Sequence, residues 1–501
     1  MSIPPLQLRR LALTLLLGAL AGHVLAMPPA HSPATTPASH APTPAPATAS
    51  APGATQDKPQ VVETTLDNGL KILVKPDRRA PIVTSQVWYR VGSSYEYGGI
   101  TGVSHLLEHM MFKGTERLAP GEFSRIIAAN GGDENAFTSR DYTAYFQTLA
   151  ADRLEISFKL EAERMRRLAL PKDEFLKELE VVKEERRLRT EDDPESMTFE
   201  RFNATAYEAS PYRIPIIGWS SDLDSIQVED LRAWYRRWYA PNNATLVVVG
   251  DVDPAEVFAL ANKHFAPLQP EPIAPPKPRT EPEQIGAKSL IVRAPAKEPY
   301  LLFGYKTPAL HELGPDSEQA WEPYALEMLA AVLDDGASSR FSRHLVRGQQ
   351  IAAAADASYS AFSRLSGMLL FDGTPAKGQD IEALEQAMLA EIGQLRDEPV
   401  APDELARIRT QLIAGKIYEQ DSVFYQAMLL GQLESVGLGW RLADDYVKHL
   451  AAVTPEQIQA VARRYIRPEN RTRAVLEPLP LDGATNEASA VTATGDHRHV
   501  R

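Results

Sequence analysis

The segment at residues 105–109 has the sequence HLLEH, so that His105 and His109 are four residues apart with Glu108 between them. Apolar residues around them recur at helical spacing, and we expect a helix with both histidines on one face. Neutral imidazole nitrogens on successive turns can both reach one divalent zinc ion. Glu108 projects into the same space, where it could act as a base on a water held by the metal. The segment therefore predicts a zinc centre that could support hydrolysis.

A second element must face this helix, because a catalytic zinc centre takes three protein ligands and keeps one position open. The acidic segment at residues 171–187 is expected to be a helix, on which Glu178 and Glu185 lie two turns apart and share one face. Glu184 is the alternative to Glu185 as third ligand. Solvent-exposed amphipathic helices that bind no metal would also explain these residues.

Several separated motifs decide between these interpretations. In order along the chain they are H-x-x-E-H at 105–109, FKGT at 112–115, NAFTSRDYTAY at 135–145, E-x-x-V-V-x-E-E at 178–185 and Asp193-Pro194. Together they resemble the pitrilysin, insulinase and mitochondrial processing peptidase family, in which the order of the H-E-x-x-H motif is inverted. The resemblance implies a zinc metalloendopeptidase.

The resemblance also implies a role for each matching residue. His105, His109 and Glu185 would bind one Zn²⁺ per chain, with Glu108 as the general base. Glu178 would orient a ligand. Glu185 is preferred to Glu184 because its distance from His109 matches the spacing in the family and its helical phase matches Glu178.

The segment Asn135, Ala136 and Phe137 is expected to be an exposed edge strand. An edge strand can bind an extended peptide through main-chain hydrogen bonds that do not depend on the peptide's sequence. The resemblance supports this, since the family binds peptides along such a strand, and Phe137 would then line a pocket. The plain alternative is an edge strand followed by a turn, without a ligand.

Proline-rich residues 267–284 divide the rest of the chain into a zinc peptidase domain at 59–266 and a second domain at 285–480. The apolar helix expected before Gly336 echoes the helix before Gly114, and Ala331 then falls near the place of His109. The resemblance implies that the second domain is homologous but has lost its metal. The fold class expected is α+β, each domain a mostly antiparallel sheet with packed helices, the two forming half of a clam-shell chamber.

In many relatives a segment of the second domain, of the form Arg, several residues, then Gly-Leu-Ala-Tyr, supplies an arginine and a tyrosine to the catalytic chamber. Arg347 is present here, but alanines replace the tyrosine, and Tyr359 is too distant to substitute. This arginine and tyrosine would hold the substrate. Either the chain lacks that substrate clamp, or a partner chain of the same fold provides it. We favour a partner, as a homodimer or a heterodimer with a zinc-lacking homologue.

The first 26 residues are typical of an export signal, with two arginines, an apolar run and a small-residue cleavage site. Residues 27–58 are a spacer rich in proline and alanine, and residues 481–501 a flexible tail in which His497 and His499 are expected to be incidental. No other stretch is long and apolar enough to span a bilayer. We expect a periplasmic protein, exported by the general or the twin-arginine route.

Composition restricts the partners further. The formal net charge is -13 and the chain has no cysteine, which argues against nucleic acid as a partner and excludes disulfides. The closed chamber that the family resemblance implies would select short or unfolded peptides as substrates. The alternative function is a noncatalytic zinc-binding or substrate-presenting subunit.

Overall fold

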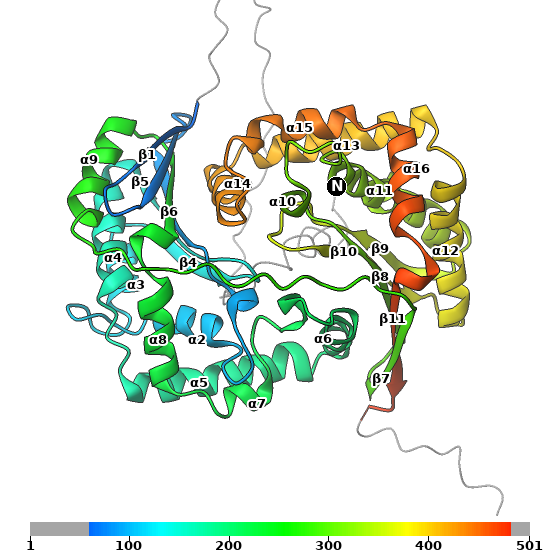
Figure 1. Cartoon of the computed structure of the whole chain (residues 1–501), viewed down its shortest axis with the longest axis horizontal. Helices are drawn as coiled ribbons and strands as arrows, with labels where there is room; N and C mark the ends of the chain where they lie inside the picture. The colour runs from blue at the N-terminus through cyan, green and yellow to red at the C-terminus, as the bar shows by residue number, and fades with distance from the viewer. Residues whose placement is uncertain (1–59, 482–501) are drawn as a thin grey trace, which may run out of the picture.

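The computed structural model describes residues 60–481, which form two halves, each built on one mixed sheet (Figure 1). The α+β fold class predicted from the sequence is therefore correct. The expected export signal at 1–26, the spacer at 27–58 and all but the first residue of the tail lie outside the described residues. Among residues 60–481, no helix has the length and apolar character needed to cross a membrane.

The first sheet has six strands in the order β1-β2-β6-β3-β5-β4, and all neighbours are antiparallel except β2 and β6. Its first hairpin, β1–β2, turns at Asn68-Gly69, a residue pair typical of tight hairpin turns. Gly69 has a φ of +86°, and a Cβ there would approach that of Asn242 to 2.7 Å, so only glycine suits this turn. The strands are β1 (Val62–Thr65), β2 (Lys71–Pro76), β3 (Ile82–Tyr89), β4 (Asp133–Thr138), β5 (Thr143–Ala150) and β6 (Ala244–Gly250).

Helices of the first half cover one face of this sheet and bury its largest apolar cluster against β2, β3 and β5. The two helices expected around residues 105–109 and at 171–187 are found as α2 and α5. A five-residue π-helical segment, Arg187–Glu191, follows α5 directly. The helices are α2 (Val103–Met110), α3 (Glu122–Ala129), α4 (Leu154–Arg166), α5 (Lys172–Arg186), α6 (Pro194–Ala206), α7 (Ser220–Leu223), α8 (Val228–Trp238) and α9 (Pro254–Phe265).

The second sheet has five strands in the order β7-β11-β8-β10-β9, with only β7 and β11 parallel. Ala331, which the similarity of the two apolar helices in sequence predicts to fall near the place of His109, is buried in the apolar core of the second half. The strands are β7 (Lys288–Pro295), β8 (Tyr300–Thr307), β9 (Ala352–Ser358), β10 (Gly367–Pro375) and β11 (Arg471–Leu479). The helices are α10 (Leu310–Leu313), α11 (Glu322–Asp334), α12 (Ile381–Asp397), α13 (Pro402–Glu419), α14 (Val423–Ser435), α15 (Leu442–Ala452) and α16 (Pro455–Tyr465).

Each half contributes one helix that packs on the sheet of the other half, so both halves help to bury each sheet. Helix α14 of the second half packs on β3 and β6 of the first sheet, and α6 of the first half packs on β7 and β11 of the second (Figure 1). Under α14, Trp88 lies in a cluster with Ala427 and Leu430. Neither half therefore has a complete core of its own.

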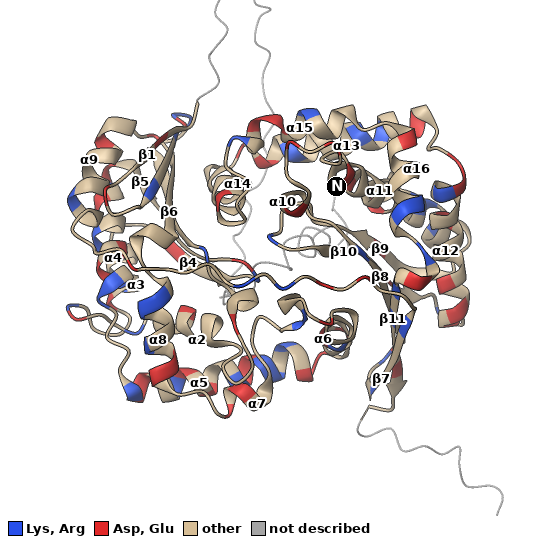
Figure 2. Ribbon diagram, viewed as in Figure 1, with Lys and Arg blue, Asp and Glu red and all other residues tan. Residues whose placement is uncertain are grey.

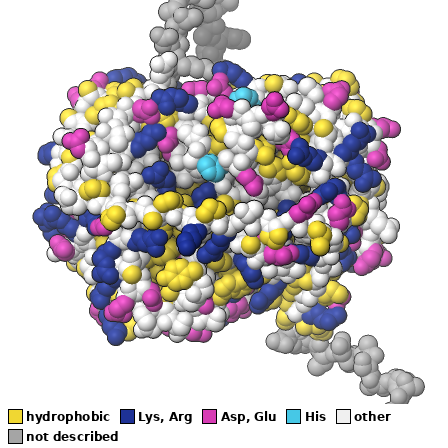
Figure 3. Space-filling view, viewed as in Figure 1, with side chains coloured by type: hydrophobic (Ala, Val, Ile, Leu, Met, Phe, Trp, Pro, Cys, Tyr) yellow, Lys and Arg dark blue, Asp and Glu magenta, His cyan; other side chains and the backbone are white. Residues whose placement is uncertain are grey.

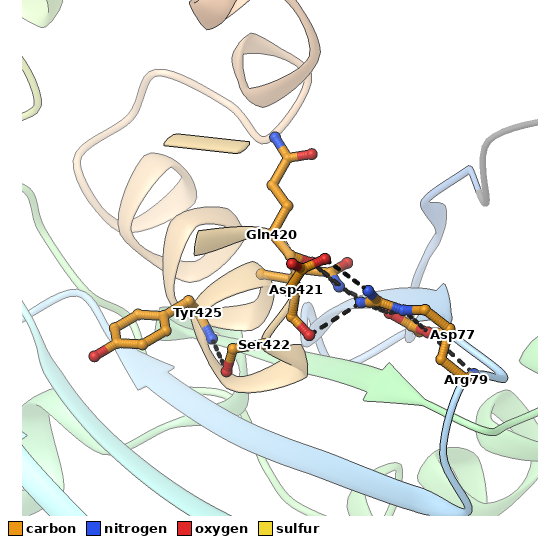
Figure 4. A network of polar contacts seen from close by, with 7 residues as sticks. Asp77, Arg79, Gln420, Asp421, Ser422 and Tyr425 are labelled. Carbon is orange, nitrogen blue, oxygen red and sulfur yellow. Dashed lines mark hydrogen bonds and ion pairs between the residues drawn. The ribbon is translucent and has the colours of Figure 1, made fainter. Parts of the chain in front are cut away.

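Polar contacts fix the start of α14 to the first half. Arg79 pairs with Asp77 at 2.6 Å and with Asp421 at 3.0 Å, and it also donates to the carbonyl of Gln420 (Figure 4). Gln426 donates to Asp77 at 2.9 Å. These contacts join the turn between β2 and β3 to the turn between α13 and α14.

A second polar contact between the halves lies beside the β4–β5 turn. Arg364 donates from Nε to Asp141 at 3.3 Å and from Nη2 to Ser94 at 2.8 Å, and its guanidinium lies over the ring of Tyr95. Both Asp141 and Ser94 are buried, so this network is shielded from water. A loop of the second half thus supports the turn that follows β4.

The proline-rich segment between the halves is extended and tied down at several points. Glu281 accepts backbone N–H groups of Glu208, Ala209 and Ser210 at 2.7–2.9 Å and pairs with Lys306 of β8 at 2.5 Å. The surface of the molecule is mixed in character. The face seen in Figure 3 carries charged side chains of both signs with apolar side chains between them.

Candidate metal centre

The start of helix α2 is fixed by the glycine that precedes it and by a buried glutamate. Gly102 has a φ of +88°, and a Cβ there would lie 2.5 Å from the carbonyl oxygen of Ile217. The fully buried carboxylate of Glu96 accepts the N–H groups of Gly102 and Ser104 at 2.8 and 2.9 Å. Burial raises the pKa of Glu96 to about 7, although these bonds act in the opposite direction. Glu96 thus caps the first turn of the helix, directly before His105.

Helix α5 packs against α2 and carries the two glutamates that face it. Its buried residues Phe175, Leu179 and Val182 recur at three- and four-residue intervals, so they form one stripe toward the core. Glu178 and Glu185 border this stripe and point at α2. Glu184 points away, with 55% of its side chain exposed, and pairs with Arg187.

The three predicted ligands come together between the two helices. The Nε2 atoms of His105 and His109 lie 3.7 and 3.3 Å from the two carboxylate oxygens of Glu185. Tetrahedral zinc with ligands at about 2.1 Å would separate them by roughly 3.4 Å. Two imidazoles and one carboxylate therefore fit a zinc ion in both chemistry and spacing. Within residues 60–481, no other group of histidines and carboxylates converges in this way.

The histidines differ in protonation. Burial, reinforced by the charge of His109, lowers the pKa of His105 to about 4, so its imidazole is neutral and can donate a lone pair. His105 Nδ1 is buried and has no hydrogen-bond partner among residues 60–481. Burial acts against protonation of His109 as well, but its contacts with Glu178 and Glu185 prevail and raise its pKa to about 9. Metal binding must therefore replace a proton at His109.

Glu178 contacts the other side of the His109 ring, with Oε2 at 3.3 Å from Nδ1. A carboxylate at Nδ1 fixes the tautomer that leaves Nε2 free for a metal. The Nζ atom of Lys113 lies 2.7 Å from the second oxygen of Glu178. Lys113 was not among the residues predicted from the sequence, although its spacing of four residues from His109 could have indicated it.

Glu108 lies beside the ligands with only 6% of its surface exposed. Burial raises its pKa to about 7, which suits a general base near neutral pH. The Thr138 hydroxyl donates to Glu108 Oε2 at 2.5 Å. Thr138 ends strand β4, and sequence analysis did not identify it because the two residues are 30 apart with no local pattern linking them.

Arg189 is a further residue that the sequence analysis missed. Its Nη1 lies 2.5 Å from Glu185 Oε1, and 44% of its side chain is exposed. The spacing of four residues between Glu185 and Arg189 is the signal that could have indicated this pair.

The predicted substrate strand is β4, which pairs with β5 at one side; its other edge faces no strand among residues 60–481. Asn135 and Ala136 lie in this strand, and the Asn135 side chain accepts the N–H of Ala136 at 2.8 Å. Phe137 differs from expectation. Its ring packs on Trp88 at 5.5 Å and belongs to the core under α14, so it lines no open pocket.

Arg347 is not brought to the metal ligands in this chain. It lies in the π-helical segment Phe341–Gly348 of the second half, where it donates to the carbonyls of Ser342 and Ala337. Tyr359 donates to the carbonyl of Pro308 and is also held elsewhere. The expected arginine of a substrate clamp is thus absent from this chain's own metal centre.

Comparison with known proteins defines the family. Residues 71–219 match the family described as insulinase (peptidase family M16), and residues 225–412 match the peptidase M16 inactive domain. This chain belongs to peptidase family M16. The zinc protease PqqE of Helicobacter pylori is 32% identical to this M16 chain over 428 residues, which cover 84% of this chain and 93% of that relative.

Solved structures share the fold. A protease from Helicobacter pylori has a TM-score of 0.79 at 32% identity, covering 84% of this M16 chain and 100% of its own. The periplasmic protease PqqL of Escherichia coli has a TM-score of 0.69 at 19% identity. That match covers 89% of this chain but only 52% of PqqL, so this chain corresponds to about half of it.

Proposed function

We propose that this M16 chain is an exported zinc-dependent endopeptidase that cleaves short or unfolded peptides. The observation that carries the proposal is the convergence of His105, His109 and Glu185 at spacings that suit zinc, with the buried carboxylate of Glu108 beside them. The names of its relatives support zinc as the metal. In this proposal residues 59–266 form the catalytic domain, and residues 285–480 a homologous domain without metal.

Zinc bound by the three ligands would supply a Lewis acid that polarises the scissile carbonyl and makes water acidic. The chain's own residues would transfer the proton and hold the reacting side chains in position. Glu108 accepts the proton of the attacking water and passes it to the leaving amine, for which its pKa near 7 is suited. Thr138 holds the carboxylate in place through Oε2, and Glu178 keeps the proton of His109 on Nδ1.

The free edge of β4 is the proposed site for the peptide main chain. Asn135 and Ala136 would offer backbone groups to an extended peptide, which favours substrates without folded structure. The same strand ends at Thr138, which bonds to Glu108. A peptide paired with β4 would therefore run close to the general base.

We also propose that two M16 chains, as a homodimer or with a zinc-lacking homologue, enclose the chamber. The match to about half of PqqL supports pairing. Arg347 lies away from its own metal centre, which is consistent with a role in the partner's chamber. PqqL is described as a periplasmic protease, and the signal-like residues 1–26 support the same location for this chain.

Peptide hydrolysis by residues 27–501, with zinc and an unstructured peptide mixture, tests the function. We expect wild-type activity, and a loss of at least about 10²-fold in Glu108→Gln with zinc still bound. Glu184→Gln, the matched control, should retain activity because Glu184 faces solvent. Equal activity of wild type and Glu108→Gln would refute the role of Glu108. Zinc binding without hydrolysis would point to a missing partner chain or to the noncatalytic alternative.

A further inference from the structure

We propose that Arg189 is a positioning residue that holds Glu185 by one carboxylate oxygen and weakens zinc binding at this centre. The inference rests on the proposed metallopeptidase function and adds a control of metal affinity to it. Glu185 Oε1 lies 2.5 Å from Arg189 Nη1 but 3.7 Å from His105 Nε2. The arginine is thus much closer to this oxygen than the histidine is.

The local backbone brings Arg189 to this position. Helix α5 ends at Arg186, and the π-helical segment Arg187–Glu191 continues it with wider turns. Arg189 lies one turn beyond Glu185 and folds back onto it. Charged residues of both signs lie along this part of the chain (Figure 2).

The neighbouring arginines have other partners, so the contact with Glu185 is particular to Arg189. Arg186 is buried and pairs with Glu200 at 2.8 Å. Arg187 pairs with Glu184 and Asp192. Arg187 has 48% of its side chain exposed and Arg189 has 44%, which makes Arg187 a matched control for charge and exposure.

A guanidinium on a ligand carboxylate has two opposite effects on metal binding. It orients the carboxylate, which favours binding, and it places a permanent positive charge next to a divalent cation, which opposes binding. The orienting effect is the smaller here, because Glu185 is already held by His109 at 3.3 Å between packed helices. The repulsive effect remains, so loss of Arg189 should tighten zinc binding.

As a result of this contact, the two carboxylate oxygens of Glu185 face different partners. Arg189 occupies Oε1, while Oε2 faces His109 Nε2. Lys113 pairs with Glu178 in the same manner on the other side of His109. Each of the two carboxylates that face His109 is thus paired with a cation.

The test is zinc affinity, measured by competition with a chromogenic chelator on residues 27–501. Wild type is compared with Arg189→Gln, Arg189→Lys and Arg187→Gln. We expect Arg189→Gln to bind zinc about tenfold more tightly than wild type, because one repulsive charge is lost. Arg189→Lys keeps the charge and should stay close to wild type. Arg187→Gln should change the Kd by less than about twofold, since its charge is paired away from the ligands.

Salt provides a second readout that a merely structural role would not affect. The difference between wild type and Arg189→Gln should shrink as NaCl rises from about 0.02 to about 0.5 M, because Arg189 is partly exposed and its charge is screened. Circular dichroism confirms that each variant is folded, and Arg189→Ala serves as a second neutral variant with the same expected tightening.

Three results separate the possible failures. Zinc binding in both neutral variants that is as weak as wild type, or weaker, would overturn the inference. Equal tightening in Arg187→Gln would also overturn it, because the effect would then be one of general surface charge. A wild-type chain that binds no zinc would refute the proposed function itself.

Discussion

The packing of α14 on the first sheet predicts that a side chain at Gly431 destabilises the protein. A Cβ added to this residue of α14 would lie 2.1 Å from Cε2 and 2.2 Å from Nε1 of Trp88. Trp88 cannot yield, because it is fully buried, donates its Nε1–H to Gln86 at 3.0 Å and packs on Phe137 at 5.5 Å. Gly431→Ala must therefore push α14 away from β3.

The expected cost follows from two opposing contributions. Overpacking of a close-packed core costs about 1–3 kcal/mol of unfolding free energy, while alanine gains about 1 kcal/mol over glycine inside a helix. The net is a loss of about 0–2 kcal/mol, and the 2.1 Å approach to Trp88 places Gly431→Ala toward the upper end of that range. The matched control is Gly415→Ala in α13, where no atom lies within 4 Å of the added Cβ, so this variant should be more stable than wild type.

Thermal denaturation of both variants beside wild type measures the effect. Gly431→Ala should lower the Tm by a few degrees, and Gly415→Ala should raise it slightly. Limited proteolysis should cut Gly431→Ala faster in α14 than wild type. If Gly431→Ala melts at or above the wild-type temperature, α14 does not pack on Trp88 as described.

Four further predictions test other parts of the molecule. The raised pKa of Glu96, about 7 against 4.5, means that its stabilising effect is complete below about pH 4.5 and is lost as pH rises through 7. The unfolding free energy of wild type relative to Glu96→Gln should therefore fall by up to about 3 kcal/mol between about pH 5 and pH 8; a difference independent of pH would contradict this. Thr138→Val removes the hydrogen bond to Glu108 and should lower kcat about tenfold at unchanged zinc content, whereas an unchanged kcat would show that the bond is dispensable. Arg364→Ala leaves the buried carboxylate of Asp141 without its cation and should cost about 2 kcal/mol in urea unfolding, with no loss counting against the contact between halves. Zinc at about 100 times its Kd should stabilise the chain by about 2.7 kcal/mol, so that a chelator lowers the Tm; a Tm insensitive to chelator would mean that the folded chain binds no zinc.

The convergence of His105, His109 and Glu185 could be predicted largely because neighbouring turns of two helices position these side chains. The helical repeat alone places His105 and His109 on one face, and it places Glu178 and Glu185 two turns apart. The choice of Glu185 over Glu184 needed the family spacing, and the geometry agrees with it, since Glu184 faces solvent. Contacts between distant segments could not be predicted. Thr138 and Glu108 meet only because β4 lies beside α2.

In the fold, too, contacts between segments that are distant in sequence could not be predicted. Strands and helices of the first half follow from turn residues and periodicity, but α14 is apolar on more than one side, which indicates burial without naming the partner sheet. The family resemblance predicts that Phe137, in a peptide-binding edge strand, lines a pocket. The position of α14 decides instead that its ring is in the core. The proline-rich boundary was visible in composition, whereas its anchor at Glu281 depends on Lys306 in the other half.

The most direct test of the central claim is the zinc content of purified residues 27–501, measured by mass spectrometry after dialysis, in wild type, Glu185→Gln and Glu184→Gln. The structure predicts one zinc per chain in wild type and in Glu184→Gln, and loss of tightly bound zinc in Glu185→Gln. Full zinc content in Glu185→Gln, or its loss in Glu184→Gln, would contradict the assignment of His105, His109 and Glu185 as the metal centre.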